Sequence, residues 1–167
     1  MRAVSDTGPL IHLSWLDHLS LLNQLFEAIT VPPAVRDELL APPYGTPGLD
    51  KLHTAFERGE ILVSSWIDRS MVSGTAKPEL DAGEAEAIPL ALTLGADIFL
   101  TDDSAARAEG VRLGMKVLGT VGLLVLAREQ GLISAAYPLV VRLRERGQWL
   151  SDAIVEAVRE DESEGQP

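Results

Sequence analysis

The sequence predicts an α/β protein, a three-layer α/β/α sandwich of the Rossmann-like kind with a central parallel sheet of about five strands and extra C-terminal helices. Short apolar segments alternate with helical patterns along the chain, and no internal repeat interrupts this order. The length of 167 residues allows one domain with a substantial core. Strands and helices in alternation imply parallel strands joined by right-handed crossovers.

The first third of the chain contains two predicted strands and two predicted helical segments. A strand is expected at 2–5, and leucines at helical spacing over 9–26 predict a helix with a break near Asp17. A second strand at 28–31 ends at a pair of prolines. Proline in a first helical turn favours the next helix at 34–40.

The middle of the chain contains one strand between two irregular segments. Residues 41–48 are rich in Pro and Gly, which predicts a loop, and a helix is expected at 49–58. A third strand follows at 61–64. Residues 66–80 show no clear periodicity, so they are expected to run over the surface.

The clearest helix signal lies at 81–94. Asp81 and Glu84 match a capping box, and Gly95 is suited to ending the helix. The remaining predicted elements are strands at 97–100 and 116–118 and helices at 105–113, 121–130, 139–146 and 150–160. We predict one main domain at 1–150, followed at 151–167 by the end of a C-terminal helix and an acidic tail.

The composition excludes several classes of protein. A bilayer span needs about 20 apolar residues, and no run of that length is present. The chain shows no secretory signal pattern, and it contains no Cys for disulfides, thiolate metal sites or a cysteine nucleophile. We therefore expect a cytoplasmic protein with no membrane partner.

The charge balance argues against binding nucleic acid by bulk attraction. Asp and Glu number 25 against 14 Lys and Arg, which gives a formal charge of −11. Proteins that bind nucleic acid through bulk charge are usually basic. A role with nucleic acid must therefore rest on a localised site.

Acidic residues collect where such a site is expected. In parallel α/β sheets the working site lies at the carboxyl ends of the strands. Asp6 follows the first strand, and Asp102 and Asp103 follow the fourth. Glu38 lies in the helix after the second strand, and Glu84 begins the helix before the fourth. Clustered carboxylates repel one another unless a cation intervenes, and Mg²⁺ prefers such oxygen ligands.

Each of these acids also has an ordinary structural interpretation. Asp6 could cap the following helix, and Glu84 could be only the return half of the capping box. Glu38 could be a solvated helix residue, while capping would explain either Asp102 or Asp103 but not both. The coincidence of all five at one edge of a sheet favours the metal-binding interpretation.

Four stretches of the chain also match a known family in order and spacing. They are VSDTGPLI at 4–11, VPPAVRDEL at 31–39, GEAEAI at 83–88 and LTDD at 100–103. With these stretches the sequence resembles PIN-domain ribonucleases, particularly the toxin-like (VapC-like) branch. The resemblance extends from residue 4 to about residue 131 and on through the C-terminal helices. It implies a PIN-like fold.

The resemblance implies an acidic quartet and its metal. Carried over by position, the quartet falls on Asp6, Glu38, Glu84 and Asp103, and the Thr-x-Asp pattern selects Asp103 over Asp102. Asp102 is then either an additional metal ligand or a group that supports the ligands. The expected cofactor is Mg²⁺ or Mn²⁺, bound by Asp6 and Asp103, with Glu38 and Glu84 binding directly or through water.

The same resemblance suggests supporting residues. Thr7 and Thr101 match hydroxyl positions that hydrogen-bond the carboxylates. Glu86 is an alternative to Glu84, but the spacing back from Gly95 favours Glu84.

The implied function is a metal-dependent endoribonuclease. The metal would lower the pKa of a water molecule and neutralise charge on the scissile phosphate, and Glu38 or Glu84 would accept a proton. The implied partners are an RNA substrate, a small antitoxin protein and a second copy of the chain. The leucine-rich stretch at 10–26 is compatible with a dimer face.

Cationic and aromatic residues are further candidates for contact with RNA. Seven of the fourteen basic residues lie between Arg107 and Arg146. Arg107 is placed either to contact a phosphate or to form a salt bridge with Asp103 or Glu109. The loop at 42–45 is interpreted as a connector. The histidines at positions 12, 18 and 53 lack the spacing of metal ligands, and His12 and His18 are interpreted as ordinary helix-face residues. The tryptophans are interpreted as packing anchors: Trp15, Trp66 and Trp149.

Two rival functions remain. A phosphohydrolase of the haloacid-dehalogenase type would need a second acid at position 8, which is Gly, and a suitably placed lysine, whereas the lysines are Lys51, Lys77 and Lys116. A non-catalytic PIN-like binding module is the other rival, and the complete acidic quartet argues against it.

Overall fold

The computed structural model describes residues 1–41, 47–67 and 81–164. It contains a five-stranded sheet in which every pairing is parallel, with the order β3-β2-β1-β4-β5. The predicted loop at 42–45 and most of the irregular segment at 66–80 lie outside the described residues. The strands are β1 (Arg2–Ser5), β2 (Ala28–Val31), β3 (Leu62–Val63), β4 (Ile98–Leu100) and β5 (Val117–Leu118).

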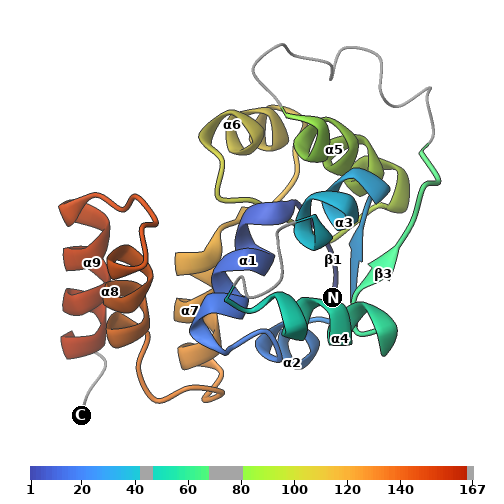
Figure 1. The fold of residues 1–167 in the computed structure, drawn as a ribbon. Coiled ribbons are helices and arrows are strands. Elements are labelled where there is room, and N and C mark those ends of the chain that lie inside the picture. Colours follow the sequence, from blue (N-terminus) through green and yellow to red (C-terminus); the bar gives the residue numbers. More distant parts are fainter. Residues whose placement is uncertain (42–46, 68–80, 165–167) are drawn as a thin grey trace.

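Helices surround this sheet, as the sequence predicts (Figure 1). Their bounds agree with the predicted ones to within a few residues, and the largest shifts are at the two C-terminal helices. The helices are α1 (Thr7–Leu16), α2 (Leu21–Leu25), α3 (Pro33–Leu40), α4 (Leu49–Glu57), α5 (Ala82–Leu94), α6 (Ser104–Arg112), α7 (Thr120–Glu129), α8 (Tyr137–Glu145) and α9 (Asp152–Glu164).

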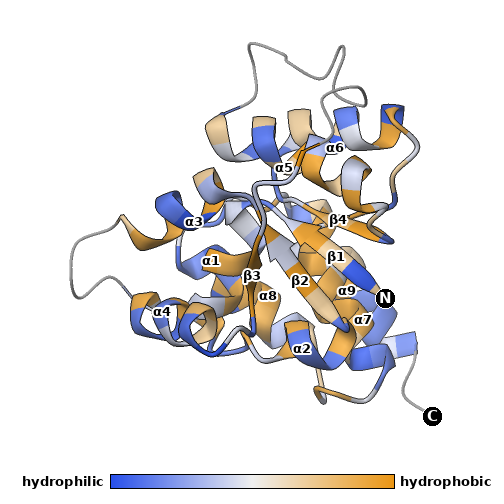
Figure 2. Ribbon diagram, turned by 90° about the vertical axis from the view of Figure 1, so that its right-hand side faces the viewer, coloured by the Kyte–Doolittle hydropathy of each residue, from blue (hydrophilic) through white to orange (hydrophobic). Residues whose placement is uncertain are grey.

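Two hydrophobic clusters cover opposite faces of the sheet, which confirms the three-layer architecture. Successive strand residues point to opposite faces, so Ala3 belongs to one cluster and Val4 to the other. Ala3 joins side chains from α1, α2, α3, α4 and α7, whereas Val4 and Phe99 pack against α5 and α6. Figure 2 shows apolar residues gathered along the strands and on the helix faces beside them.

The predicted break near Asp17 is confirmed. Asp17 has φ 64°, in the left-handed region, and its N–H is directed at the carbonyls of Leu13 and Ser14 at the end of α1. The leucines around the break are buried in the core of this chain, with Leu10 and Leu13 fully inaccessible to solvent. The folding of the chain itself therefore accounts for the apolar pattern at 10–26, and the homodimer stays a prediction.

The last two helices form a hairpin beside α1 and α7 (Figure 1). Val155 and Val158 of α9 belong to the larger hydrophobic cluster. The Glu162 carboxylate of α9 accepts hydrogen bonds from the backbone N–H groups of Ala136 and Tyr137 at the start of α8. The predicted division at residue 150 stays a prediction, because nothing here tests it. Among the described helices, none combines the length and apolarity that a membrane crossing requires.

Candidate active site

Neighbouring strand ends bring the first acids together. β1 pairs with β4, and the backbone N–H of Asp6 donates to the carbonyl of Leu100 at 3.0 Å, which extends the ladder past the end of β1. Asp6 also caps α1, because its Oδ1 accepts from the N–H of Gly8 at 3.1 Å. Asp103 caps α6 through a 2.8 Å hydrogen bond from the N–H of Ala106. Capping thus fixes the orientation of two predicted site residues.

A third acid comes from the start of α5. The predicted capping box is confirmed: Asp81 Oδ1 accepts from the N–H of Glu84 at 2.9 Å, and Glu84 Oε2 accepts from the N–H of Asp81 at 3.2 Å. Glu84 is nevertheless buried, with 8% of its surface exposed. Glu84 therefore caps α5 and also lines the acidic pocket, while its role as a metal ligand stays a prediction.

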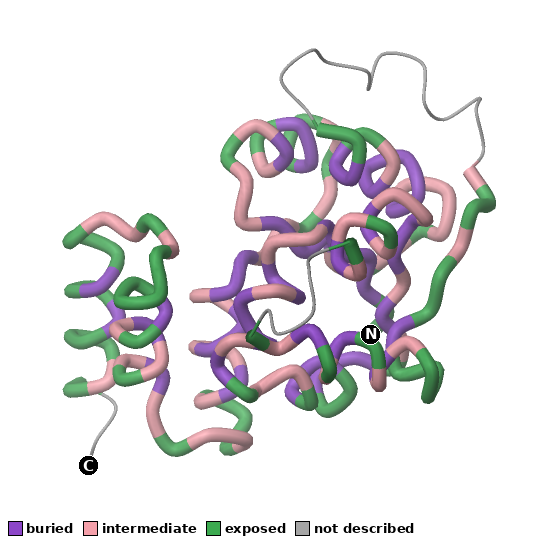
Figure 3. The backbone as a smooth tube through the Cα atoms, viewed as in Figure 1, coloured by how far each residue is buried: buried purple, intermediate pink, exposed green. Residues whose placement is uncertain are grey.

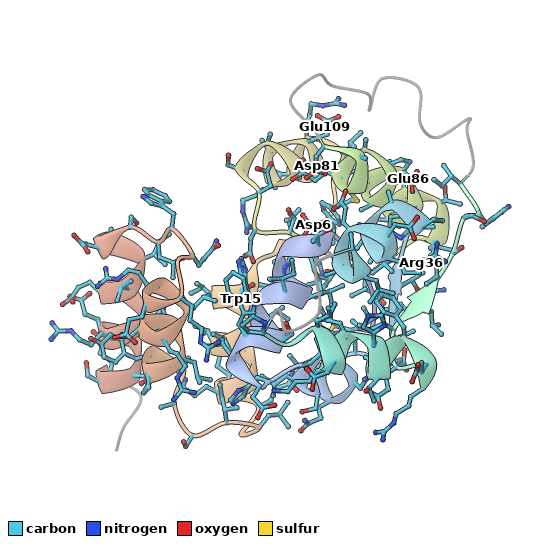
Figure 4. The ribbon with its side chains drawn as sticks, in the orientation of Figure 1. Asp6, Trp15, Arg36, Asp81, Glu86 and Glu109 are labelled. Atoms are coloured by element: carbon cyan, nitrogen blue, oxygen red, sulfur yellow. The ribbon has the colours of Figure 1, made fainter. Side chains whose placement is uncertain are left out.

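These carboxylates share one pocket of about 180 Å³. Its described lining contains four acids and no basic side chain. Figure 4 shows Asp6 at the start of α1 and Asp81 beyond it toward α5 and α6. The lining residues are Asp6, Thr7, Gly8, Asp81, Glu84 and Asp103.

Glu38 lies beside this pocket and is hydrogen-bonded to its wall. Its Oε2 accepts from the Thr7 hydroxyl at 2.5 Å, and its Oε1 accepts from the N–H of Gly83 at 3.0 Å. A Cβ on Gly83 would lie 2.8 Å from Glu38 Oε2, so the glycine allows this close approach. Glu86, the alternative to Glu84, instead accepts from the N–H of Ala34 at 3.1 Å and is absent from the pocket lining.

The electrostatics of the pocket oppose ionisation of Asp6. Burial raises its pKa strongly, and the charges of Asp102 and Glu84 raise it further. Hydrogen bonds from the Thr101 hydroxyl and the N–H of Gly8 act in the opposite direction, and the resulting pKa is about 8. In the metal-free protein Asp6 is therefore largely protonated at neutral pH.

Glu84 is displaced in the same direction. Burial raises its pKa most, and the nearby charges of Asp81, Asp103 and Glu38 add to the rise, giving a pKa of about 7. The hydrogen bond from the Asp81 N–H offsets part of it. Perturbed carboxyl groups of this kind concentrate at functional sites.

Asp102 occupies a different environment behind the pocket. Its Oδ2 accepts from His12 Nδ1 at 2.7 Å and from the Thr120 hydroxyl, while its Oδ1 accepts from the Thr120 N–H at 2.7 Å. Burial raises its pKa, but these hydrogen bonds outweigh burial, so its pKa lies below the usual range. With both oxygens engaged, Asp102 links α1 to α7, which favours the supporting role over direct metal ligation.

Sequence reasoning missed the role of His12. The expectation of an ordinary helix-face residue is wrong, because His12 is 7% exposed, bonds to Asp102 and contacts the Trp15 ring edge-on at a centroid distance of 5.2 Å. One signal was available: α1 is apolar on most of its surface, and a polar residue buried in such a helix requires a partner.

Replacing Asp102 with Ala is expected to lower the free energy of unfolding by about 1–3 kcal/mol, since it leaves buried donors of His12 and Thr120 unpaired. Urea unfolding at pH 7 measures the change. Asp50→Ala, in the exposed first turn of α4, is the control and is expected to change stability by less than about 0.5 kcal/mol. Equal losses in the two variants would contradict the role assigned to Asp102.

The structure also bears on the sequence interpretations of Arg107 and the tryptophans, while contact of Arg107 with a phosphate stays a prediction. The Arg107 guanidinium donates from Nη2 to the Thr101 carbonyl at 3.0 Å, whereas Glu109 is paired with Arg112. The interpretation of the tryptophans as packing anchors is wrong for two of them, because Trp66 is 66% exposed and Trp149 is 82% exposed.

Comparison with known proteins supports a single assignment. The PIN-domain family model DUF3368 matches residues 2–164, nearly the whole chain. The chain belongs to the PIN-domain family. PIN domains are in general nucleases, and they typically use divalent metal ions. No curated protein matches the chain.

The pocket of this PIN domain suits a divalent cation in its chemistry. Within the described segments, no group of three or more Asp, Glu or His side chains is arranged to hold an ion by itself. Mg²⁺ does not require such a group, because it takes one or two carboxylates and keeps several waters. The donor set consists of oxygens. The pKa of Asp6 is raised mainly by burial and further by the charges of Asp102 and Glu84, and the described pocket lining contains no basic side chain to offset these charges. The residues therefore fit an ion held mainly through water.

Proposed function

We propose that this PIN domain is a metal-dependent endoribonuclease that hydrolyses RNA phosphodiesters. The observation that carries the proposal is the acidic pocket, where buried carboxylates with raised pKa values gather and the described lining contains no basic side chain. We assign the metal, Mg²⁺ or Mn²⁺, to Asp6 and Asp103, with Glu84 and Glu38 acting through water.

Each acidic residue of the pocket has a separate role in the proposed reaction. A bound divalent cation supplies a water of lowered pKa and neutralises charge on the phosphate. Asp6 and Asp103 are held by helix caps, so they need no rearrangement to face the pocket. Glu84 has a pKa of about 7, which suits a group that accepts a proton near neutral pH. The Thr7 hydroxyl and the Gly83 N–H keep Glu38 oriented.

Two alternatives lose support in the structure. In a haloacid-dehalogenase-type enzyme a second acid would stand at position 8, but a Cβ on Gly8 would already lie 3.3 Å from Asp102 Cβ. A carboxylate therefore does not fit there without displacing Asp102. The non-catalytic module is disfavoured because all four acids of the quartet are present at the same sheet edge.

The acidity of the chain is compatible with this proposal because it is localised. The five acids Asp6, Glu38, Glu84, Asp102 and Asp103 contribute −5 of the net −11. The segment at 152–164, with six acids and one Arg, contributes another −5. The rest of the chain is thus nearly neutral, so its net charge does not oppose the approach of RNA.

We also propose that the chain acts as the toxin of a toxin–antitoxin pair and forms a homodimer in the cytoplasm. The sequence resemblance supports this finer assignment, and an acidic pocket is a suitable receptor for a cationic side chain of an antitoxin. Expression with and without the product of a neighbouring small gene, followed by copurification and growth measurements, tests it. Unimpaired growth without that product and failure to copurify would count against it.

The activity itself is tested with purified protein and fluorogenic single-stranded RNA. We expect cleavage with Mn²⁺ or Mg²⁺, no cleavage in EDTA, and no release of phosphate from small phosphomonoesters. Phosphate release without RNA cleavage would instead favour the phosphohydrolase. Equal cleavage in EDTA would remove the metal from the mechanism.

A further inference from the structure

A second and larger cavity adjoins the acidic pocket. Its volume is about 500 Å³, within the range of pockets that hold small ligands. Asp103 lines both cavities, so the two lie next to each other at the start of α6. The other walls come from α7 and from the connection between α8 and α9, which is the end of this hairpin nearer to α6 (Figure 3).

The α8–α9 connection presents an indole to this cavity. Trp149 lines it and is 82% exposed, and Ile154 lines it and is 41% exposed. Large apolar side chains exposed next to one another mark binding surfaces more often than chance. Aromatic rings of this kind provide stacking platforms for the bases of single-stranded nucleic acid.

The side chain of Arg107 provides a positive charge in the lining of the same cavity. Its Nη2 is anchored on the Thr101 carbonyl at 3.0 Å. Gly119 makes room for this arrangement, because a Cβ there would lie 2.7 Å from both Arg107 Nη2 and Asp102 Oδ1. A guanidinium has five N–H donors, so an anchored Arg107 retains donors for a phosphate oxygen.

We propose that this second cavity binds the nucleotide next to the scissile phosphate of a single-stranded RNA, with its base stacked on Trp149 and its phosphate on Arg107. The inference rests on the proposed ribonuclease function and adds a substrate subsite to it. Polar side chains of Ser104 and Gln148 in the same lining supply hydrogen-bonding groups for a base edge. An unpaired base is required, because a base within a duplex cannot stack on a side chain.

The position of this cavity next to the acidic pocket favours RNA over a protein occupant. A strand whose phosphate lies at Asp103 places its next nucleotide in the adjoining cavity without leaving the surface. The cavity also combines one cation with one exposed aromatic ring, which is the pairing that single-strand sites use. A protein partner or a second copy of the chain is an outcome that the experiments below would reveal.

The first experiment compares alanine substitutions of two exposed tryptophans, one in the lining of the second cavity and one after the edge strand β3. Trp149→Ala is expected to raise KM for short single-stranded RNA about 5- to 150-fold, the range for loss of one stacked base, with kcat unchanged within about twofold. Trp66→Ala, after edge strand β3, serves as the matched control and should leave KM unchanged. Trp149→Phe should restore most of the affinity. Equal KM values in the two alanine variants would overturn the proposal.

The second experiment does not depend on cleavage. Binding of fluorescent oligouridylate to the Asp6→Asn protein is measured with and without the Trp149→Ala change. We expect the Kd to rise 5- to 150-fold on losing the indole. If the wild-type protein cleaves no RNA but this loss is seen, the ribonuclease proposal fails while the subsite stands. If affinity is unchanged, or if Trp149→Ala instead alters the oligomeric mass, the subsite is overturned.

Discussion

Replacing Asp6 with Asn should reduce the rate of RNA cleavage by at least about 1,000-fold. The substitution preserves the shape of the side chain but removes the charge that would hold the cation, and metal stabilisation of the transition state is worth several kcal/mol. The Asn oxygen can still accept the hydrogen bond from the Gly8 N–H. Single-turnover cleavage of a fluorogenic RNA with saturating Mn²⁺ measures the loss.

Two glutamates on one helix provide the matched comparison. Glu84→Gln should lower cleavage by about 100-fold or more, because it removes a proton acceptor in the pocket. Glu86→Gln lies two residues further along α5, outside the pocket lining, and should retain activity within about threefold. A greater loss at Glu86 than at Glu84 would show that the acidic quartet is misassigned.

The same Asp6→Asn substitution should stabilise the metal-free protein at high pH. The pKa of Asp6 is raised from its ordinary value of 3.8 to about 8, so its stabilising contribution is fully present below about pH 4 and is lost as the pH rises to 8. Asn does not ionise and avoids this loss. In EDTA at pH 9 we expect the variant to unfold about 3–10 °C above the wild type, which corresponds to roughly 1–3 kcal/mol.

The pH dependence separates this effect from a general change in packing. At pH 4 or below Asp6 is protonated in the folded protein and largely so in the unfolded chain, so the melting temperatures of the two proteins should agree within about 2 °C. At pH 9 a divalent metal should stabilise only the wild type, so that the wild type then melts at a higher temperature than the Asp6→Asn variant. A variant that is less stable than the wild type at both pH values would contradict the raised pKa.

The sheet and the position of the acids follow from local signals in the sequence. Asp6 and Asp103 stand directly after two short strands, and parallel strands end at one edge. The capping box of Asp81 and Glu84 marks the start of α5 without reference to the rest of the fold. These features could be predicted because each depends on residues within a few positions of one another.

Other parts of the site depend on contacts between distant segments. The bond between His12 and Asp102 joins positions 90 residues apart. The pairing of β4 with β5, in which Leu100 lies opposite Leu118, brings Thr120 to the same carboxylate. Asp81 has the sequence pattern of an ordinary cap, yet the approach of α5 to β1 places it in the pocket. The exposure of Trp149 depends on the path of the chain between α8 and α9, and the hydrophobic periodicity of the sequence does not predict that path.

Calorimetric titration with Mn²⁺ tests the central claim, that the acidic pocket binds a divalent cation, most directly. The account predicts saturable binding to the wild type, with proton release at pH 7 as protonated Asp6 and Glu84 ionise. Glu86→Gln should bind the ion as the wild type does, whereas Asp6→Asn should bind at least about 100-fold more weakly. Equal Mn²⁺ affinity in all three proteins would contradict the account.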